Sequence, residues 1–465
     1  MSRHFPKPGP LKRLSACLVL ASCLAIPACA MRSPIGAQIS ADFREVVREA
    51  KDNVFPAVLF VKCIKESNES GRKISEEISG SGVIISPRGE FLTNWHVVDK
   101  ATEVRCLLFD GRAFEAKVVG TDKDTDLALV QLDLPPNSAP LPCAGLGDSG
   151  KLTEGDFVMA MGAPWGLSRS VSIGIVSCTR RFLPDHSEYS LWLQSDASIS
   201  PGNSGGPLVN TAGEVVGVNT LATFVGGDMG FSIPSDTVKN VVAQLRQYGK
   251  MNWSWTGLQL QPLRDFNRNM YFDAADGVIV AQTDPESPAR GAGIQERDRV
   301  IKINGAPVTA TTEEDLPAVR KLLGLLPKGK PATIELIRNT ETITVALSPR
   351  EKGKVEGEEL ALPRWDFTVK TVNRFDNPEL YFQKKEGVFV YGVKYPGNAN
   401  DAGLARNDIL VKIDGKDADA LADVKAIHKE AVEKIATKHR VVITALRNGL
   451  MRQIVLDFLR DYEKE

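Results

Sequence analysis

The stretch Pro201-Gly202-Asn203-Ser204-Gly205-Gly206-Pro207-Leu208 decides how the rest of the chain is interpreted. Ser204 stands among glycines, which accept backbone φ angles that a Cβ atom would forbid. Such a turn can expose the serine hydroxyl and point several backbone N–H groups at one place, as a nucleophile and an oxyanion site require. A glycine-rich turn with a chance serine explains the octapeptide equally well, so the partners that the chain offers Ser204 must decide.

A serine nucleophile needs a base, which is usually a histidine, and the chain contains five. His96 ends an apolar, strand-like segment, Phe91-Leu92-Thr93-Asn94-Trp95-His96, where its side chain can be held rigidly. The others lie in a targeting segment, a polar stretch or distant sequence of another kind: His4, His186, His428 and His439. His96 is therefore the candidate base.

The orienting acid should be an aspartate beside apolar residues, and Asp126 in Thr125-Asp126-Leu127-Ala128 fits. Asp122 and Asp124 lie in a polar turn and are weaker candidates. The order His, Asp, Ser is that of chymotrypsin-type proteases and not that of subtilisins or α/β-hydrolases. The octapeptide also matches the G-x-S-x-G pattern of α/β-hydrolases, but that fold needs its histidine after the serine.

Three segments together resemble the active-site motifs of the HtrA family of serine proteases. They are Thr93-Asn94-Trp95-His96-Val97-Val98, Thr125-Asp126-Leu127-Ala128 and Gly202-Asn203-Ser204-Gly205-Gly206-Pro207-Leu208. The resemblance implies a mainly β fold with a chymotrypsin-like double β-barrel, ATP-independent endoproteolysis of misfolded proteins, and trimer-based assembly. It makes His96, Asp126 and Ser204 the expected triad, and Gly202, Asn203 and Ser204 the expected oxyanion hole.

Two further positions refine the chemistry. Asn203 carries no charge to pair with a freed N-terminal amine, so we expect activity to be set by loop rearrangement and not by propeptide cleavage. Ser198 lies six residues before the nucleophile, where the base of the specificity pocket is expected, and Ile199 follows it. A pocket without a charge at its base favours small aliphatic residues before the cleaved bond, while Asp196 is interpreted as structural.

Length and composition indicate a soluble protein of two to four domains. The 465 residues are 43% hydrophobic and 25% charged, with a net charge of −1. The near-neutral charge makes sequence-independent nucleic-acid binding improbable. We expect no metal or other cofactor, because no cysteine pair has CxxC spacing and the proposed chemistry needs none.

The first thirty residues have the pattern of an export signal. Basic residues precede an apolar run from Leu14 to Ile26 that is short for a membrane span. Ala28-Cys29-Ala30 offers a signal-peptidase site, whereas Leu20-Ala21-Ser22-Cys23 resembles a bacterial lipobox. Residues 1–30 are thus a signal peptide or a lipoprotein leader, and we expect the periplasm or cell envelope, with a lipid anchor as the alternative. In an oxidising compartment Cys63 and Cys106 could form a disulfide, or they could equally be small buried apolar side chains. The sequence does not decide whether Cys143 and Cys178 form disulfides.

Residues 41–250 are expected to form the protease domain. Short β-branched runs alternate with turns from Pro56 onward, as in a β-barrel, and a second set of strands follows Pro142. Helical spacing of apolar residues predicts a short helix over 40–51 and a closing helix over 237–248. The polar segment from Glu66 to Glu77 is predicted to be a short exposed loop.

The C-terminal half repeats itself. Four pairs of residues are each separated by 110 positions: Trp255 and Trp365, Gly277 and Gly387, Asp298 and Asp408, Gly305 and Gly415. Each unit has the size of one small domain. Both resemble PDZ domains, predicted over 253–349 and 360–460, with a charged linker from Pro349 to Glu359.

PDZ domains add a peptide strand to one of their own and hold its C-terminal carboxylate on backbone N–H groups. Gly257, Leu258, Gln259 and Leu260 are the candidate binding residues in the first unit. Phe367 stands at the matching place in the second unit, where a bulky residue disfavours carboxylate capture. A unit that only packs or assembles is the simpler interpretation there.

The leading hypothesis is an exported serine endoprotease that acts on unfolded proteins and binds C-terminal peptides at its first PDZ unit. The alternative is a PDZ-bearing scaffold or chaperone-like binding protein whose protease domain is idle. Candidates at all three triad positions favour the enzyme, and peptide hydrolysis separates the two.

Overall fold

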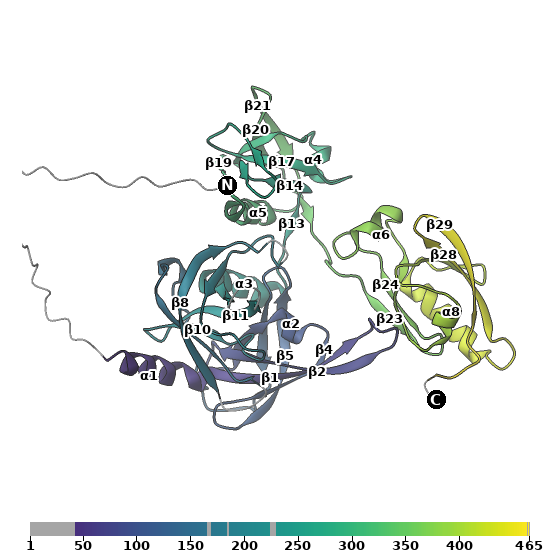
Figure 1. Ribbon diagram of the computed structural model, residues 1–465, viewed down its shortest axis with the longest axis horizontal. Helices are drawn as coiled ribbons and strands as arrows, with labels where there is room; N and C mark the ends of the chain where they lie inside the picture. Colours follow the sequence, from purple (N-terminus) through teal and green to yellow (C-terminus); the bar gives the residue numbers. More distant parts are fainter. Residues whose placement is uncertain (1–41, 165–168, 184–185, 224–228, 463, 465) are drawn as a thin grey trace, which may run out of the picture. The chain divides into compact units, whose positions relative to one another are not determined.

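The computed structural model describes residues 42–462 and 464, except residues 165–168, 184–185 and 224–228 (Figure 1). The export leader expected at residues 1–30 lies outside the described residues. Within the described part, no helix has the length and apolar character needed to cross a membrane. The described residues have a mainly β fold, in which two closed six-stranded barrels are followed by a six-stranded and a seven-stranded sheet.

The first barrel has the strand order β1-β2-β3-β6-β5-β4 and is closed by antiparallel pairs. Its strands are β1 (Val58–Ser67), β2 (Ile74–Ile84), β3 (Glu90–Asn94), β4 (Ala101–Leu107), β5 (Ala113–Asp122) and β6 (Leu127–Leu132). The inward side chains of these runs form one buried cluster that includes Leu59, Phe91 and Leu129. The barrel is therefore a packed core, as the β-branched runs predict.

The loop predicted from Glu66 to Glu77 is wrong at both of its ends. Strands β1 and β2 continue as a ladder through Lys65↔Glu76 and Ser67↔Ile74, which leaves only a short tip. The side chains of β2 over Ile74–Ser79 are half-buried or exposed. Since neither face of this part of the hairpin is buried, its sequence lacks the alternation of apolar and polar residues that reveals a strand.

The second barrel has the order β10-β11-β12-β9-β8-β7. Its strands are β7 (Phe157–Gly162), β8 (Ser170–Arg181), β9 (Trp192–Ser195), β10 (Pro207–Asn210), β11 (Val215–Thr223) and β12 (Met229–Pro234). Pro207 begins β10 directly after the glycine-rich turn, so the turn with Ser204 is anchored at its end by a barrel strand.

Among the described residues, three α-helices accompany the barrels: α1 (Phe43–Val54), α2 (Trp95–Val98) and α3 (Ser235–Tyr248). Helix α3 buries Val238, Val241, Val242 and Leu245 in the core shared with the barrels, which confirms the predicted closing helix. It ends at Gly249, whose φ of 70° terminates the helix in the left-handed region.

The next sheet is built from residues 258–347. Its main path is β14 (Leu258–Gln261), β17 (Val278–Thr283), β18 (Arg299–Ile303), β20 (Ala332–Arg338) and β21 (Glu341–Leu347), with α4 (Pro288–Gly291) and α5 (Leu316–Gly324). The short strands beside this path are β13 (Ser254–Trp255), β15 (Arg264–Asp265), β16 (Met270–Tyr271), β19 (Ala306–Pro307) and β22 (Arg350–Glu351). Strand β14 is at one edge and, among the described strands, pairs only with β17.

The last sheet is built from residues 359–457. Its main path is β23 (Glu359–Leu362), β24 (Phe367–Thr371), β25 (Val388–Val393), β26 (Ile409–Ile413), β28 (Arg440–Arg447) and β29 (Leu450–Asp457), with β27 (Lys416–Asp417), α6 (Pro378–Gln383), α7 (Asn398–Asp401) and α8 (Leu421–Glu433). From β24 onward this path follows the same order as β14-β17-β18-β20-β21. The difference is β23, which adds a strand outside β24.

Equivalent contacts link the repeated landmarks in the two sheets. Arg338 donates two hydrogen bonds of 2.7 Å to the carboxylate of Asp298. Arg447 does the same to Asp408 over 2.6 Å. Both aspartates are almost fully buried, and a buried carboxylate needs such a bidentate partner. The spacing of 110 residues therefore marks positions with the same local role.

Candidate active site

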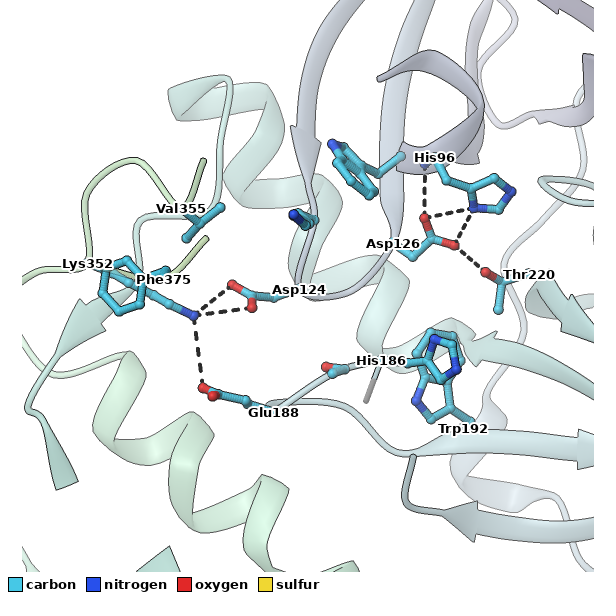
Figure 2. Close-up of a pocket in the computed structure, with 13 residues that line it drawn as sticks. His96, Asp124, Asp126, His186, Glu188, Trp192, Thr220, Lys352, Val355 and Phe375 are labelled. Atoms are coloured by element: carbon cyan, nitrogen blue, oxygen red, sulfur yellow. Dashed lines mark hydrogen bonds and ion pairs between the residues drawn. The ribbon is translucent and has the colours of Figure 1, made fainter. Parts of the chain in front are cut away.

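His96 and Asp126 meet at one end of the first barrel. His96 lies in α2, directly after β3, and Asp126 lies directly before β6, which pairs with β3. The imidazole Nδ1 is 2.9 Å from Asp126 Oδ2 and 3.0 Å from Oδ1 (Figure 2). The carboxylate can thus fix the tautomer with hydrogen on Nδ1, which leaves Nε2 free to accept a proton.

The backbone around Asp126 is arranged to serve both residues. Asp126 has φ of 56°, a left-handed conformation that aspartate tolerates better than most side chains. Its carbonyl oxygen accepts hydrogen bonds from the Trp95 amide and the Asn94 side chain. Its carboxylate also accepts the His96 amide at 3.0 Å, so the acid orients the start of α2 as well as the ring.

Thr220 on β11 completes the surroundings of the carboxylate. Its hydroxyl donates to Asp126 Oδ2 (Figure 2), and its carbonyl oxygen accepts a hydrogen bond of 3.1 Å from Ser204 Oγ. Thr220 thereby joins the acid of the first barrel to the serine of the second. Thr220 is not among the residues predicted from the sequence, because a lone threonine 94 positions from its partner leaves no local signal.

The glycine-rich turn holds Ser204 by its backbone. The Ser204 carbonyl accepts the Ser81 amide at 2.8 Å, and the Gly205 amide donates to Asn219 O at 2.8 Å. Gly205 has φ of 86°, and a Cβ there would overlap the Ser81 carbonyl oxygen. Only glycine fits this close approach between the two barrels.

Two of the three residues expected at the oxyanion hole keep a free amide. Asn203 N–H donates to Ser200 O at 2.9 Å, which closes a turn in which Gly202 has φ of 97°. Asn203 is therefore not available as the expected donor. Among the described residues, the amides of Gly202 and Ser204 donate no hydrogen bond. The Ser81 hydroxyl, which accepts from Ala163 N, donates to Gly202 O at 2.6 Å and fixes that peptide.

A cavity of about 500 Å³ opens beside His96 and Asp126 (Figure 2). Its wall includes Thr220, Trp192 and His186, a histidine that the sequence places in a polar stretch. The cavity has room for a peptide segment beside the candidate base.

Ser198 and Ile199 do not line this cavity. Ser198 is exposed and its carbonyl accepts the Ser172 hydroxyl at 2.6 Å, whereas Ile199 is buried in a core cluster of the second barrel. Asp196 accepts the Ile175 amide at 2.7 Å, which agrees with its structural interpretation. Residues 224–228, which follow β11, lie outside the described residues.

The polar turn before Asp126 is tied to segments that follow α3. Asp122 accepts hydrogen bonds from Thr125 and, at 3.2 Å, from the Trp253 indole. Burial, together with the charge of Asp124, raises the pKa of Asp122 to about 6 against the effect of those donors. Lys352 Nζ lies 3.1 Å from Asp124 and 4.0 Å from Glu188 (Figure 2). Asp122 and Asp124 are therefore parts of a supporting turn and not the acid that contacts His96.

The candidate peptide-binding residues of the first repeat lie at an open sheet edge. Gly257 has φ of 74°, and its carbonyl accepts the Asp284 amide of the β17 end. Leu258, Gln259 and Leu260 belong to β14 and, with Gly257, line a cavity of about 740 Å³ that also contacts Leu323 of α5. A groove between an edge strand and a helix has the form that strand addition requires.

The four cysteines of the described residues, Cys63, Cys106, Cys143 and Cys178, are free. Cys63 and Cys106 are buried, and burial raises the pKa of Cys63 to about 12. In the described part of the chain, no group of three or more His, Cys, Asp or Glu side chains is arranged to hold a metal ion.

Two barrels with a His-Asp pair in one and, in the other, a serine whose own amide and that of Gly202 are free among the described residues define a trypsin-like serine peptidase. Comparisons with known families agree: the trypsin-like peptidase domain matches residues 80–218, and the PDZ domain matches residues 256–348. The chain belongs to the HtrA family of DegP-like serine endoproteases, as its relatives show.

Two relatives illustrate the extent of the likeness. A probable periplasmic serine endoprotease, DegP-like, of Pseudomonas savastanoi pv. phaseolicola is 35% identical over 394 residues, which cover 82% of this chain and 79% of the relative. The periplasmic serine endoprotease DegP of Escherichia coli K12 is 33% identical over 368 residues, or 78% and 73% of the two chains.

Solved structures give the same result. The HtrA-type protease AlgW with tripeptide superimposes with a TM-score of 0.58 at 29% identity, covering 66% of this chain and 97% of that chain. The serine endoprotease from Yersinia pestis gives 0.51 at 30% identity, covering 65% and 97%.

Proposed function

We propose that this protein is an exported, ATP-independent serine endoprotease that cleaves unfolded or misfolded proteins. The observation that carries the proposal is the pairing of His96 Nδ1 with Asp126 at 2.9 Å, across the barrel interface from a serine whose own amide and that of Gly202 are free among the described residues. The catalytic triad is His96, Asp126 and Ser204. The relatives named periplasmic support export to that compartment.

The reaction follows from these positions. Ser204 Oγ attacks the peptide carbonyl while His96 Nε2 takes its proton and then passes it to the leaving amine. Asp126 stabilises the imidazolium and holds the ring. The amides of Gly202 and Ser204 donate to the oxygen that becomes negative. Water repeats the sequence on the acyl-enzyme and releases the second product.

Activity requires a movement of the serine side chain. Ser204 Oγ donates to Thr220 O, and no hydrogen bond joins it to His96 within the described residues. A rotation about the Cα–Cβ bond releases Oγ from Thr220 O, as proton transfer to His96 requires. The Asn203 side chain meets the Ser170 hydroxyl and has no charge for an N-terminal amine. These contacts support control by loop rearrangement and not by propeptide cleavage.

Cleavage is expected after small aliphatic residues. Ser198 and Ile199 remain the proposed base of the specificity pocket, supported by their place six and five residues before Ser204 and by the lack of a charge on either. A marked preference for Arg or Lys before the cleaved bond would contradict this assignment.

The C-terminal half supplies peptide recognition. We assign residues 41–250 to the protease domain, 253–349 to the first PDZ domain and 360–460 to a second PDZ-type domain. The shared strand order of the two sheets and the paired Asp-Arg contacts support the second assignment. Gly257–Leu260 hold the C-termini of substrates at the first, and a homotrimer or a multiple of it is the expected assembly.

A fluorophosphonate that phosphonylates an activated serine tests the proposal without a choice of substrate. Intact-mass analysis should show one adduct on the wild-type protein, mapped to Ser204, and none on Ser204→Ala. His96→Ala is the matched control, because it keeps the hydroxyl and removes its base. An idle scaffold would leave all three proteins unlabelled.

A further inference from the structure

The sheet of the second PDZ-type domain contains a strand, β23, that has no equivalent among the described strands of the first PDZ domain. Strand β23 pairs antiparallel with β24 through Leu360↔Val369 and Leu362↔Phe367. The equivalent of β24 in the first PDZ domain is β14, which no described strand pairs with on that side. β23 therefore lies at the edge where an added peptide strand binds a PDZ domain.

The direction of β23 is also that of a captured peptide. A bound C-terminus runs antiparallel to the receiving strand and ends at the loop before it. β23 runs antiparallel to β24 and ends at Leu362, and the four-residue turn from Pro363 to Asp366 leads into β24. The Pro363 carbonyl, at the place of the terminal carboxylate, lies 2.6 Å from His428 Nε2 of α8.

The side chains of β23 occupy the groove as alternate peptide residues would. Leu362 is almost fully buried, and Leu360 packs against the same core cluster. That cluster contains Val424 and Ile427 of α8, which packs against both β23 and β24. Glu359 and Ala361 point the other way along the strand, as the pleat requires.

The turn between the two strands is fixed as well. Asp366, with φ of 60°, accepts the Asn398 amide at 3.0 Å and lies 3.2 Å from Lys394 Nζ. The Asn398 side chain donates to Arg364 O at 2.8 Å. These hydrogen bonds fix the loop that precedes β24. In a PDZ domain with an empty groove, the equivalent loop would bind the carboxylate of a peptide.

We propose that residues Glu359–Leu362 are a built-in occupant of the second groove, so that only the first of the two grooves captures peptide C-termini. Because a short covalent connection gives an effective concentration of about 1 mM or more, a free peptide of equal affinity at about 0.1 mM would displace the strand in fewer than about a tenth of the molecules. The second domain is then a folded support and not a second receptor. The part of the inference that concerns peptide capture at the first groove rests on the proposed function.

Hydrogen exchange with residue-level mass spectrometry tests this in the full mature chain carrying Ser204→Ala. Thr371 N–H donates to Glu358 O at 2.9 Å, so by alternation the amides of Phe367 and Val369 also face β23. Without peptide these three amides should exchange slowly. The amide of Leu260, on the open edge of β14, should exchange fast, and that of Leu258, which donates a long hydrogen bond of 3.4 Å to Thr256 Oγ1, should exchange faster than that of Val369.

The probe is a decapeptide ending in Glu-Leu-Ala-Leu with a free carboxylate, which copies residues 359–362. It should slow exchange at Leu258 and Leu260 and change nothing at Val369. Fast exchange at Val369 without peptide, or slowing there on addition of peptide, would overturn the proposal. A peptide without effect at either edge would contradict peptide capture by the first groove, while the peptide-free exchange still decides whether β23 fills the second.

A variant gives a positive test. Leu360→Asp should expel β23, speed exchange at Val369 by at least about tenfold, and allow the peptide to slow it again. Leu450→Asp on the opposite edge strand β29 is the control, because Leu450 is 60% exposed and its change should leave Val369 protected. If the Val369 amide still exchanges slowly in the Leu360→Asp variant while the rest of the sheet is intact, the leucine side chains of β23 do not hold this strand in the groove, and the proposal is wrong.

Discussion

Thr220→Val tests whether the Asp126 carboxylate is held by the hydroxyl from the second barrel. The substitution keeps the β-branched shape and removes one of three donors to the carboxylate, the others being the amide and Nδ1 of His96. A hydrogen bond to a charged group contributes about 1.5–3 kcal/mol. If the imidazolium of the transition state loses that support, kcat should fall by about 10- to 150-fold.

The assay is steady-state cleavage of an internally quenched peptide with an aliphatic residue before the cleaved bond. The value of kcat should fall much more than KM rises, because the hydroxyl contacts the acid and not the peptide. Thr220→Ser restores a hydroxyl and should recover most of the rate. A Thr220→Val enzyme within about twofold of wild type would refute the reasoning, since it would place the contribution of this bond below about 0.5 kcal/mol.

Three further changes test the supporting structure. Asp122→Asn removes a carboxyl group whose pKa is raised to about 6. That raised pKa stabilises the folded wild type below pH 4, and the stabilisation is lost as pH rises through 6. In urea titrations, the free energy of unfolding of the variant relative to that of the wild type should therefore increase by up to about 3 kcal/mol between pH 4 and pH 7. Gly205→Ala should abolish activity and lower the unfolding midpoint, because its Cβ would overlap the Ser81 carbonyl oxygen. Gly155→Ala, with φ of 96° but open space around it, should lower the free energy of unfolding by only about 1–2 kcal/mol. Equal effects of the two changes would contradict the close approach at Gly205. Lys352→Met should lower the thermal unfolding midpoint, because it leaves the Asp124 carboxylate without its cation. The double variant with Asp124→Asn should recover part of that loss in calorimetry. No recovery would mean that the loss of the Lys352–Asp124 ion pair does not cause the lower midpoint.

The architecture and the central residues follow from the sequence because their signals are local. His96 and Asp126 stand at the ends of apolar runs that become β3 and β6, and these strands pair directly. Ser204 stands in a turn whose glycines are required by positive φ and by contact with Ser81. Such requirements restrict residue types within a segment of about ten residues, so the sequence alone is enough to predict these elements.

The other parts depend on contacts between distant segments. Nothing near Thr220 indicates that its hydroxyl meets an aspartate of the other barrel. The charged segment from Pro349 to Glu359 is interpreted as a linker, yet β23 begins at its last residue and becomes part of the next sheet. Asn203 is an expected oxyanion donor until the turn shows its amide bonded to Ser200. Which backbone groups are already paired is decided by the folded chain, and no side-chain pattern records it.

The most direct test of the account is cleavage of reduced casein by the mature protein beside its Ser204→Ala variant. The account predicts cleavage by the wild type alone. No cleavage by either protein, even with the C-terminal peptide bound at the first groove, would favour a binding protein over an enzyme. Cleavage by both would contradict the account at its centre, because Ser204 would not be the nucleophile.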